Sequence, residues 1–361
     1  GAAVDPAQAE TPEQLMQQMR VDPLEIVLAP DLVDMVDTAS GGDLLDRVRA
    51  LRRKIALELG IVLPPVRTRD SLDLPMSTYA VRISGVEVGV GQAPPGKVLA
   101  LGDDLDTLPG AVTVEPVFGL QGKWVPAEMR HQAELTGATV VDRASVLVTH
   151  LAEIVRKNAP RLISREDVKT LTTSLKSTDA AVVDELVPNL LSLGEVQRVL
   201  QSLLEEGVAV RDLGRIYEGL SLRAKGGASH TDLVEAARAA LGPAVASPHA
   251  QDGVLRVLTL DPLLEHQFVE TLRPTESGPQ LAMDPARVER VVDEVSRKVR
   301  AVEDAGWSPV LVCAPALRAP LRRVVSLTTP GVAVLSYSEV SGPGLVVETV
   351  GVVSGAEAVA A

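Results

Sequence analysis

The sequence predicts an α/β protein of several subdomains: an α/β first subdomain, a small inserted α+β subdomain, an all-helical (winged-helix-like) middle and an α/β C-terminal subdomain. Two observations lead to this class. Strand-like alternation and helix-like spacing of apolar residues follow one another in the first and last thirds of the chain, whereas helical spacing dominates the middle. The chain has 361 residues, 46% of them hydrophobic, which is enough for several separate cores.

The first subdomain is expected at 21–92 and 140–162, after a flexible linker at 1–20 that is rich in Ala, Gln and Glu. Its strands are predicted from short stretches in which apolar and polar residues alternate. They are expected at 24–28, 61–67, 79–83 and 86–89, the last two joined as a hairpin through Ser84 and Gly85.

An amphipathic helix is expected between the first two of these strands. Asp43 is predicted to cap it, and Gly60 to end it. The residues expected to point inward are Leu44, Leu45, Val48, Leu51, Ile55 and Leu59. One further helical turn is expected at 12–19, within the linker.

The stretch QAPPG at 92–96 interrupts this pattern and opens a region of different composition. Leu and Val runs there alternate with Gly and Pro, and a helix is expected from Pro126. This region, 93–139, is predicted to be a small inserted subdomain. A helix expected at 145–157 then returns the chain to the first subdomain.

The clearest local signals lie in the helical middle subdomain, 163–243. Ser192 and Glu195 have the spacing of a capping box, in which each side chain binds the other residue's backbone N–H. Gly207 is expected to end that helix in a left-handed conformation, and Asp212 to cap the next one. The apolar run 208–210 between them predicts a brief strand.

The last subdomain is expected at 250–351, after a loose connector at 243–251. Helices are predicted to begin at Asp261-Pro262 and Asp284-Pro285, since proline is favoured in the first helical turn. A third helix is predicted at 315–327. Strands are expected at 254–260, 310–313, 332–335 and 345–350.

Composition and charge exclude several classes of function. The net charge of −13 argues against broad binding of nucleic acids or anionic membranes, which requires a basic surface. A winged-helix nucleic-acid-binding protein is kept as an alternative, because the second helix of the helix–strand–helix unit carries Arg215 and Arg223. The single cysteine, Cys313, lies in an apolar run and is predicted to be a buried structural thiol.

No catalytic, cofactor or metal site is expected. The five histidines are scattered without the spacing of metal ligands. The glycines of GVEVGVGQAPPG at 85–96 match no phosphate-binding loop, and no nucleophile-elbow motif occurs. The chain is therefore predicted not to be an enzyme.

One turn-rich stretch, EPVFGLQGKW at 115–124, holds one of two phenylalanines and one of two tryptophans. Trp124 is expected to fill the core of the small subdomain. Phe118 lies between proline and glycine, where loops often present an aromatic side chain to a partner. Core packing of Phe118 remains the other interpretation.

Seven stretches, in order along nearly the whole chain, resemble the C-terminal cytosolic region of the FHIPEP family, in its flagellar type III export gate branch. They are VDPLEIVLAPDLVDMVD (21–37), GDLLDRVRALRRKIALELGIVLPPVRTRDSLDL (42–74), GVEVGVGQAPPG (85–96), EPVFGL (115–120), TVVDRASVLVTHL (139–151), LVPNLLSLGEVQRVLQSLLEEGVAVRDLGRIYEGL (186–220) and PVLVCAPALRAPLRRVVSLTTPGVAVLSYSEV (309–340). The order of the seven makes the resemblance specific.

The resemblance implies a docking platform of four cytosolic subdomains at the cytoplasmic face of the bacterial inner membrane. It also implies an N-terminal multi-span membrane domain that this sequence lacks, and assembly into a nonameric ring. The implied partners are flagellar export chaperones carrying late substrates, components of the export ATPase complex and the FlhB-type export switch protein. No cofactor is implied.

Three family positions of a chaperone-binding dimple match this chain: the acidic residue before proline is Glu115, the aromatic residue is Phe118, and the threonine before His-Leu is Thr149. Phe118 is expected to anchor the chaperone, with Glu115 and Thr149 making polar contacts at the rim. Thr149 lies in a predicted helix, where it could instead bond to the backbone of its own helix. The equivalent gate component of a virulence-type injectisome is the second interpretation, although the EPxFGL pattern favours the flagellar branch.

Overall fold

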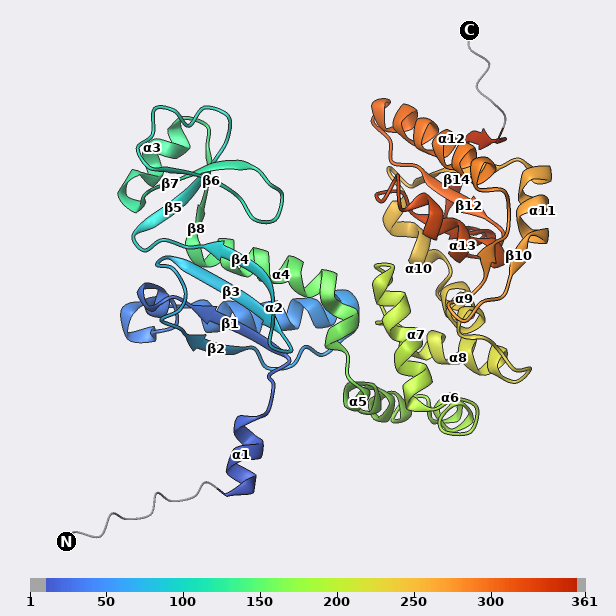
Figure 1. Ribbon diagram of the computed structural model, residues 1–361, viewed down its shortest axis with the longest axis horizontal. Coiled ribbons are helices and arrows are strands. Elements are labelled where there is room, and N and C mark those ends of the chain that lie inside the picture. The colour runs from blue at the N-terminus through green and yellow to red at the C-terminus, as the bar shows by residue number, and fades with distance from the viewer. Residues whose placement is uncertain (1–10, 356–361) are drawn as a thin grey trace. The chain divides into compact units, whose positions relative to one another are not determined.

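The computed structural model describes residues 11–355, which form two compact units divided between Ser164 and Arg165 (Figure 1). The N-terminal half of the predicted linker, 1–10, lies outside the described residues. The remainder begins with α1 (Pro12–Gln18), a short helix capped by Thr11, so the helical turn predicted at 12–19 is confirmed. The division into four subdomains stays a prediction.

The first unit contains a sheet of order β2-β1-β3-β4. Its strands are β1 (Leu24–Leu28), β2 (Arg67–Asp70), β3 (Thr78–Ile83) and β4 (Val86–Gln92). The predicted hairpin is confirmed, since β3 and β4 pair antiparallel through Ser84 and Gly85, both with positive φ. Two helices accompany this sheet, α2 (Leu44–Leu59) and α4 (Arg143–Leu162), and α4 contacts β3 and β4.

The strand predicted at 61–67 is wrong. Pro64 and Pro65 have no backbone N–H to give to a sheet, so strand pairing begins only at Arg67, in β2. The alternation that suggested a strand has another cause: Ile61 and Leu63 are both buried in the core.

The helix predicted to begin at Asp43 is confirmed as α2, with Gly60 in the left-handed conformation at its end. Two details of that prediction are wrong. The Asp43 carboxylate makes no capping hydrogen bond and pairs with Arg47 at 2.8 Å. Leu45, expected to point inward, is exposed.

A second, antiparallel sheet of order β6-β7-β5-β8 follows within the first unit (Figure 1). Its strands are β5 (Lys97–Leu101), β6 (Ala111–Val114), β7 (Gln121–Pro126) and β8 (Thr139–Asp142). The helix predicted from Pro126 is a 3-10 turn followed by α3 (Arg130–Leu135). Trp124 is buried, as predicted, and packs with Leu99 and with Val146 of α4.

The second unit begins with helices, as predicted. They are α5 (Arg165–Lys176), α6 (Ala180–Leu186), α7 (Leu193–Glu205), α8 (Leu213–Ala224) and α9 (His230–Leu241). The capping box at Ser192 and Glu195 is confirmed, and Asp212 accepts a hydrogen bond from the first turn of α8. The strand predicted at 208–210 is wrong: Val208 and Val210 are buried side chains of an irregular segment. The helix–strand–helix pattern therefore does not form.

The chain continues into a parallel sheet of order β13-β12-β9-β14. The strands are β9 (Val254–Leu260), β12 (Val310–Cys313), β13 (Val334–Ser336) and β14 (Val346–Val353), with a small hairpin of β10 (Leu272–Arg273) and β11 (Gln280–Leu281). The main helices are α11 (Pro262–Glu270), α12 (Pro285–Asp304) and α13 (Pro315–Val325). The predicted helix starts at Asp261 and Asp284 are confirmed, since each carboxylate caps its helix.

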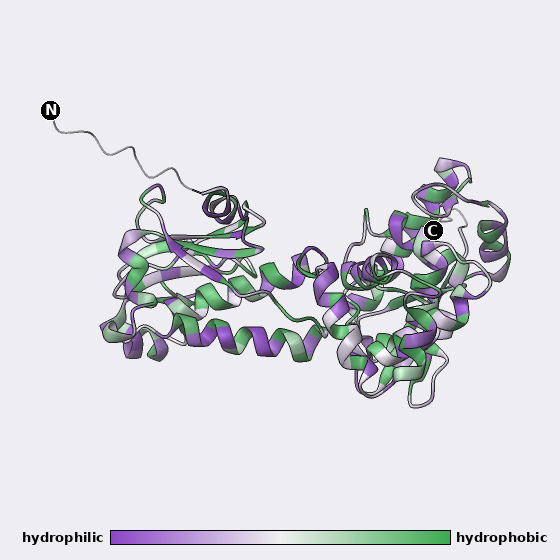
Figure 2. Ribbon diagram, turned by 90° about the horizontal axis from the view of Figure 1, so that it is seen from below, coloured by the Kyte–Doolittle hydropathy of each residue, from purple (hydrophilic) through white to green (hydrophobic). Residues whose placement is uncertain are grey.

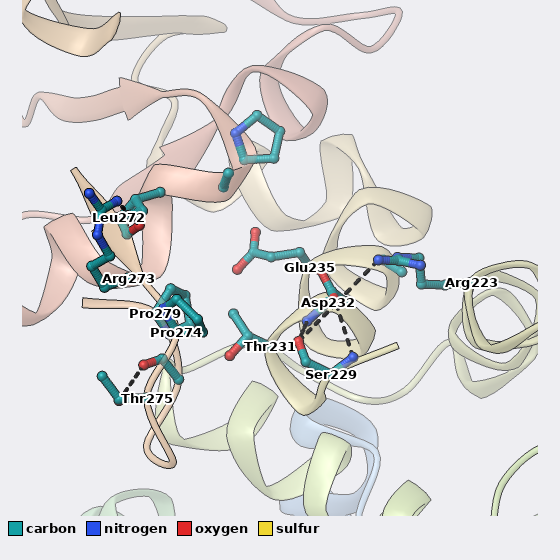
Figure 3. A pocket seen from close by; sticks show the side chains of 14 residues that line it. Arg223, Ser229, Thr231, Asp232, Glu235, Leu272, Arg273, Pro274, Thr275 and Pro279 are labelled. Carbon is teal, nitrogen blue, oxygen red and sulfur yellow. Dashed lines mark hydrogen bonds and ion pairs between the residues drawn. The ribbon is translucent and has the colours of Figure 1, made fainter. Parts of the chain in front are cut away.

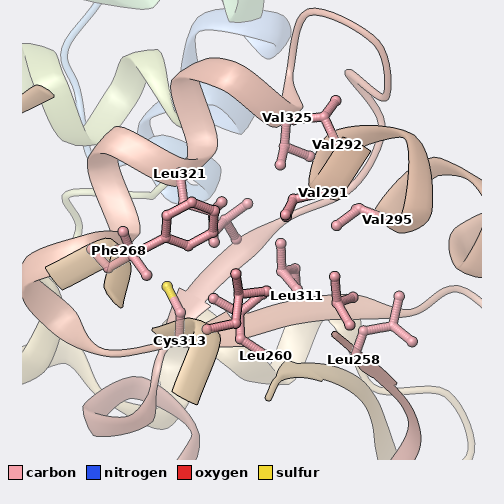
Figure 4. Close-up of a cluster of buried hydrophobic side chains, with 14 of the residues drawn as sticks. Leu258, Leu260, Phe268, Val291, Val292, Val295, Leu311, Cys313, Leu321 and Val325 are labelled. Carbon is pink, nitrogen blue, oxygen red and sulfur yellow. The ribbon is translucent and has the colours of Figure 1, made fainter. Parts of the chain in front are cut away.

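The core of this α/β part is aliphatic apart from Phe268 and Cys313 (Figure 4). Burial strongly raises the pKa of the Cys313 thiol, so the predicted buried structural thiol is confirmed. The connector predicted to be loose at 243–251 is wrong, because it holds α10 (Pro243–Ala246) and a 3-10 turn (Ser247–His249). A last short helix, α14 (Tyr337–Val340), follows β13.

A buried ionic cluster joins several helices within the second unit. Arg318 of α13 is fully buried and bonds Glu206 at 2.6 Å and Glu235 of α9 at 2.8 Å. Arg238 of α9 bonds Glu339 of α14 at 2.6 Å. These carboxylates neutralise arginines that could not otherwise be buried.

Hydrophobic and hydrophilic residues alternate along the helices, as expected for helices with one buried face (Figure 2). In 11–355, no helix has both the length and the apolar composition needed to cross a membrane.

Candidate functional site

The loop 115–120, between β6 and β7, is held by hydrogen bonds to its own first residue. The Glu115 carboxylate accepts the N–H of Val117 at 2.9 Å and the N–H of Phe118 at 2.7 Å. The Glu115 N–H donates to the Leu120 carbonyl at 2.8 Å, and its carbonyl accepts the N–H of Gly119 at 3.1 Å. Gly119 has φ 68, a conformation that glycine adopts without strain. The loop therefore has a defined shape before any partner arrives.

This loop presents apolar side chains to solvent. Phe118 is 73% exposed and Leu120 is 50% exposed. Core packing of Phe118 is thereby ruled out, and the aromatic side chain is displayed on a fixed backbone. An aromatic side chain on a preorganised loop loses little conformational entropy when it is buried against a partner.

Glu115 has a different place from the one expected. It is only 7% exposed, and both of its carboxylate oxygens are used by the loop. In the free protein the carboxylate is thus occupied by its own loop, and a contact between Glu115 and a partner stays a prediction. Its carboxylate holds the backbone that carries Phe118.

Thr149 lies on α4 with its side chain exposed. Within 11–355 its hydroxyl makes no hydrogen bond to the helix backbone, so it is available to a partner. Val146, one turn earlier on the same helix, packs against Leu99 and Trp124 of the second sheet. Thr149 is thus placed beside the contact between α4 and the small sheet.

A buried pair of side chains connects the loop electrostatically with α4. The Tyr79 hydroxyl and Nδ1 of His150, the residue after Thr149, lie 2.9 Å apart, within hydrogen-bond distance. Burial raises the pKa of Tyr79, and the charge of Glu115 raises it further. Burial lowers the pKa of His150, and the same Glu115 charge partly opposes that effect. The charge of Glu115 therefore acts on the pKa values of both rings.

Two glycines of β4 allow this close packing. A Cβ on Gly89 would lie 3.3 Å from Nε2 of His150, and a Cβ on Gly91 would lie 2.3 Å from the Tyr79 hydroxyl oxygen. The sequence predicted these glycines as part of a hairpin but gave no reason for them. Tyr79 and His150 were not predicted as site residues, because a separation of 71 positions in the chain leaves no local pattern.

A cavity of about 740 Å³ in the second unit is lined by residues of α9 and of the hairpin β10–β11 (Figure 3). Its polar groups satisfy one another: Asp232 accepts from Ser229 at the start of α9 and pairs with Arg223 at 3.2 Å. Glu235 in its wall is bound to Arg318. Ser229 and Asp232 form the capping box of α9, so their hydrogen bonds stabilise the start of that helix. In the part of the chain that the structure describes, no three His, Cys, Asp or Glu side chains are grouped as metal ligands.

The nucleic-acid alternative requires a free basic face on α8, and the basic residues there are paired with acids. The ion pairs are Arg215–Asp212, Arg223–Asp232 and Lys225–Glu185. Paired charges release few counterions from a phosphate backbone, so this face favours no nucleic acid.

The chain is similar in sequence to flagellar biosynthesis proteins. It is 35% identical over 347 residues to the flagellar biosynthesis protein FlhA of Bacillus subtilis, covering 95% of this chain and 51% of that protein. It is 36% identical over 362 residues to FlhA of Caulobacter vibrioides, covering 97% of this chain and 51% of that protein. The chain thus spans about half the length of these relatives.

Solved structures of low sequence identity share the fold. The Chlamydia pneumoniae CdsV protein superposes with a TM-score of 0.77 at 23% identity, covering 92% of this chain and 98% of that one. Nonameric EPEC SctV-C gives a TM-score of 0.71 at 21% identity, with coverage of 92% and 98%. A family model described as the FHIPEP family matches residues 2–343. The chain belongs to the FHIPEP family.

Proposed function

We propose that this chain is a docking platform of the flagellar type III protein export gate and binds complexes of export chaperones with their late substrates. The observation that carries the proposal is the exposed Phe118 on a loop clamped by the buried Glu115 carboxylate. The flagellar relatives, at about one-third identity over nearly the whole chain, support the choice of export system.

The proposed binding surface consists of Phe118, Leu120 and Thr149, with Glu115 beneath the loop. An exposed aromatic residue of this kind is the usual centre of a protein interface, where its truncation costs about 2 kcal/mol or more. Thr149 of α4 would add a hydroxyl to this surface. The surface binds and positions a partner, and no chemical step is assigned to it.

The rest of the proposal concerns assembly. The platform would comprise four subdomains, work at the cytoplasmic face of the bacterial inner membrane and join others in a ring of nine. Solved relatives of the same fold described as nonameric support the ring. The export ATPase complex and the FlhB-type export switch protein are further proposed partners.

Calorimetric titration with a late-substrate flagellar chaperone, empty and loaded with its substrate, tests the proposal. Phe118→Ala is expected to weaken binding by about 30-fold or more, the equivalent of about 2 kcal/mol. Leu222→Ala is the matched control, since Leu222 is 75% exposed on α8 in the other unit. It should bind like the parent chain. Equal affinity of Phe118→Ala and the parent chain would refute the proposed site.

The injectisome gate component remains the second candidate, and the same titration separates the two. Chaperones of an injectisome should bind at least tenfold more weakly than flagellar ones if the flagellar assignment is right. The reverse order of affinities would assign the chain to the injectisome branch.

A further inference from the structure

Strand β6 has an open edge directly beside the Phe118 loop. It is the outer strand of its sheet, with β7 on one side and, among the described residues, no strand on the other. Its last residue, Val114, is followed at once by Glu115, which begins the loop. The edge and the Phe118 loop are therefore consecutive in the chain.

The hydrogen bonds of the loop fix which backbone groups of β6 face outward. The Glu115 N–H donates to the carbonyl of Leu120, so these two residues form a hydrogen-bonded pair. Hydrogen-bonded and non-hydrogen-bonded pairs alternate along antiparallel strands. The register pairs Thr113 with Gly122, which is therefore hydrogen-bonded, and leaves Val112 and Val114 in non-hydrogen-bonded pairs. The N–H and C=O groups of Val112 and Val114 consequently point to the open edge.

The side chains of the same two residues are exposed. Val112 is 73% exposed and Val114 is 53% exposed. Edge strands are commonly protected by lysine, by proline or by a β-bulge. β6 reads Ala-Val-Thr-Val, and its pairing with β7 shows no register shift. The strand has none of these protections.

We infer that β6 is a strand-addition site, at which an extended segment of the partner bound at Phe118 pairs with the outward backbone groups of Val112 and Val114. This inference rests on the proposed function and specifies how the partner is held. Strand addition obtains affinity from main-chain hydrogen bonds and specificity from alternate side chains. The strand-addition site and the Phe118 docking site are adjacent in the chain, because Val114 precedes Phe118 by only four positions.

The edge also defines the chemistry of the segment. Two outward residues offer two donors and two acceptors, which suits a segment of three or four extended residues. Valine, isoleucine or threonine at alternate positions would cover the exposed valines. Between 93 and 139 the chain has six acidic and three basic residues, so a neutral or basic segment is favoured.

Val112→Pro tests backbone pairing separately from side-chain contact. Proline keeps an apolar side chain but removes the outward N–H, and the bonds of Ala111 and Thr113 to β7 remain. Val112→Thr is the matched control, because it retains the N–H and the branched shape. With the loaded chaperone as the probe, Val112→Pro should bind about tenfold more weakly than the parent chain, and Val112→Thr within about threefold.

Amide hydrogen exchange in the unaltered chain gives an independent result. The amides of Val112 and Val114 should exchange fast in the free protein and slow on addition of the loaded chaperone. Amides that stay fast in the complex would overturn strand addition, even if Val112→Pro damaged the fold. Equal weakening by Val112→Pro and Val112→Thr would also overturn it, since that result indicates side-chain contact.

The proposed function and this inference fail in different ways. Strand addition alone would be refuted if Phe118→Ala lost binding while Val112→Pro bound like the parent chain and the Val112 and Val114 amides of the parent chain stayed fast in the complex. The docking site at Phe118 would then still stand. A parent chain that binds no flagellar chaperone, empty or loaded, would refute the proposed function and the inference with it.

Discussion

Replacing Glu115 by alanine tests whether chaperone binding at Phe118 requires the fixed loop as well as the aromatic side chain. The change removes both hydrogen bonds that the carboxylate accepts, from the N–H groups of Val117 and Phe118. A hydrogen bond to a charged group contributes about 1.5–3 kcal/mol, so the two together hold the loop by at least about 3 kcal/mol. The equilibrium for loop opening should then shift by a factor on the order of a hundred.

Two measurements report on this change. The amide of Phe118 should exchange on the order of a hundredfold faster in free Glu115→Ala, because the loop opens more often. Chaperone affinity should fall by about tenfold or more, because the partner must select the ordered loop. Glu115→Asp is the control, since an aspartate can still accept hydrogen bonds from following N–H groups. Its affinity should remain within about threefold of the parent chain.

The reasoning would be refuted by a Glu115→Ala variant that binds like the parent chain while Phe118→Ala does not. That result would mean that the aromatic side chain binds equally well from a disordered loop. Normal circular dichroism of Glu115→Ala is required, so that loss of binding is not taken for loss of fold.

The remaining predictions concern packing. Arg318→Met should lower the free energy of unfolding by about 3–5 kcal/mol, because it leaves the Glu235 carboxylate without its arginine, whereas Glu206 keeps its pairs with Arg238 and Arg322. Arg322→Met, at a partly exposed pair 3.7 Å long, should lower the free energy of unfolding by less than about 1 kcal/mol. Gly91→Ala should lower the free energy of unfolding by about 1–3 kcal/mol, because its Cβ would lie 2.3 Å from the Tyr79 hydroxyl oxygen. Gly226→Ala, with no atom within 4 Å of the added Cβ, should change the free energy of unfolding by less than about 0.5 kcal/mol.

Urea denaturation can follow both pairs of variants, because the chain has one tryptophan in each unit. Trp124 reports on the first unit and Trp307 on the second. The Arg318→Met effect should appear in Trp307 fluorescence, and the Gly91→Ala effect in Trp124 fluorescence. If Arg318→Met and Arg322→Met lowered the free energy of unfolding equally, the ionic cluster would not be a source of stability. If Gly91→Ala and Gly226→Ala lowered it equally, the close packing at Gly91 would be contradicted.

Short-range signals in the sequence predicted much of the fold. The capping box of Ser192 and Glu195, the helix-capping Asp212 and the left-handed Gly207 are confirmed, because each depends on residues within a few positions. Alternation of apolar residues was less reliable. It predicted strands at 61–67 and 208–210, but 61–66 and 208–210 form no strand, and their alternate apolar residues are buried by packing against other elements.

The candidate site could be predicted only in part. Phe118 stood out because an aromatic residue between proline and glycine signals a displayed side chain, and the structure places it at the surface. The loop-holding role of Glu115 was missed, because its partners are backbone N–H groups that every sequence contains. The pairing of Tyr79 with His150 depends on the packing of α4 against β3 and has no local signal.

The most direct test of the account is the affinity of the loaded flagellar chaperone for the parent chain and for Phe118→Ala, measured by calorimetry under one set of conditions. Measurable binding by the parent chain, reduced about 30-fold or more in the variant, is the predicted result. Equal binding by the two chains would contradict the claim that the loop carrying Phe118 is the docking site.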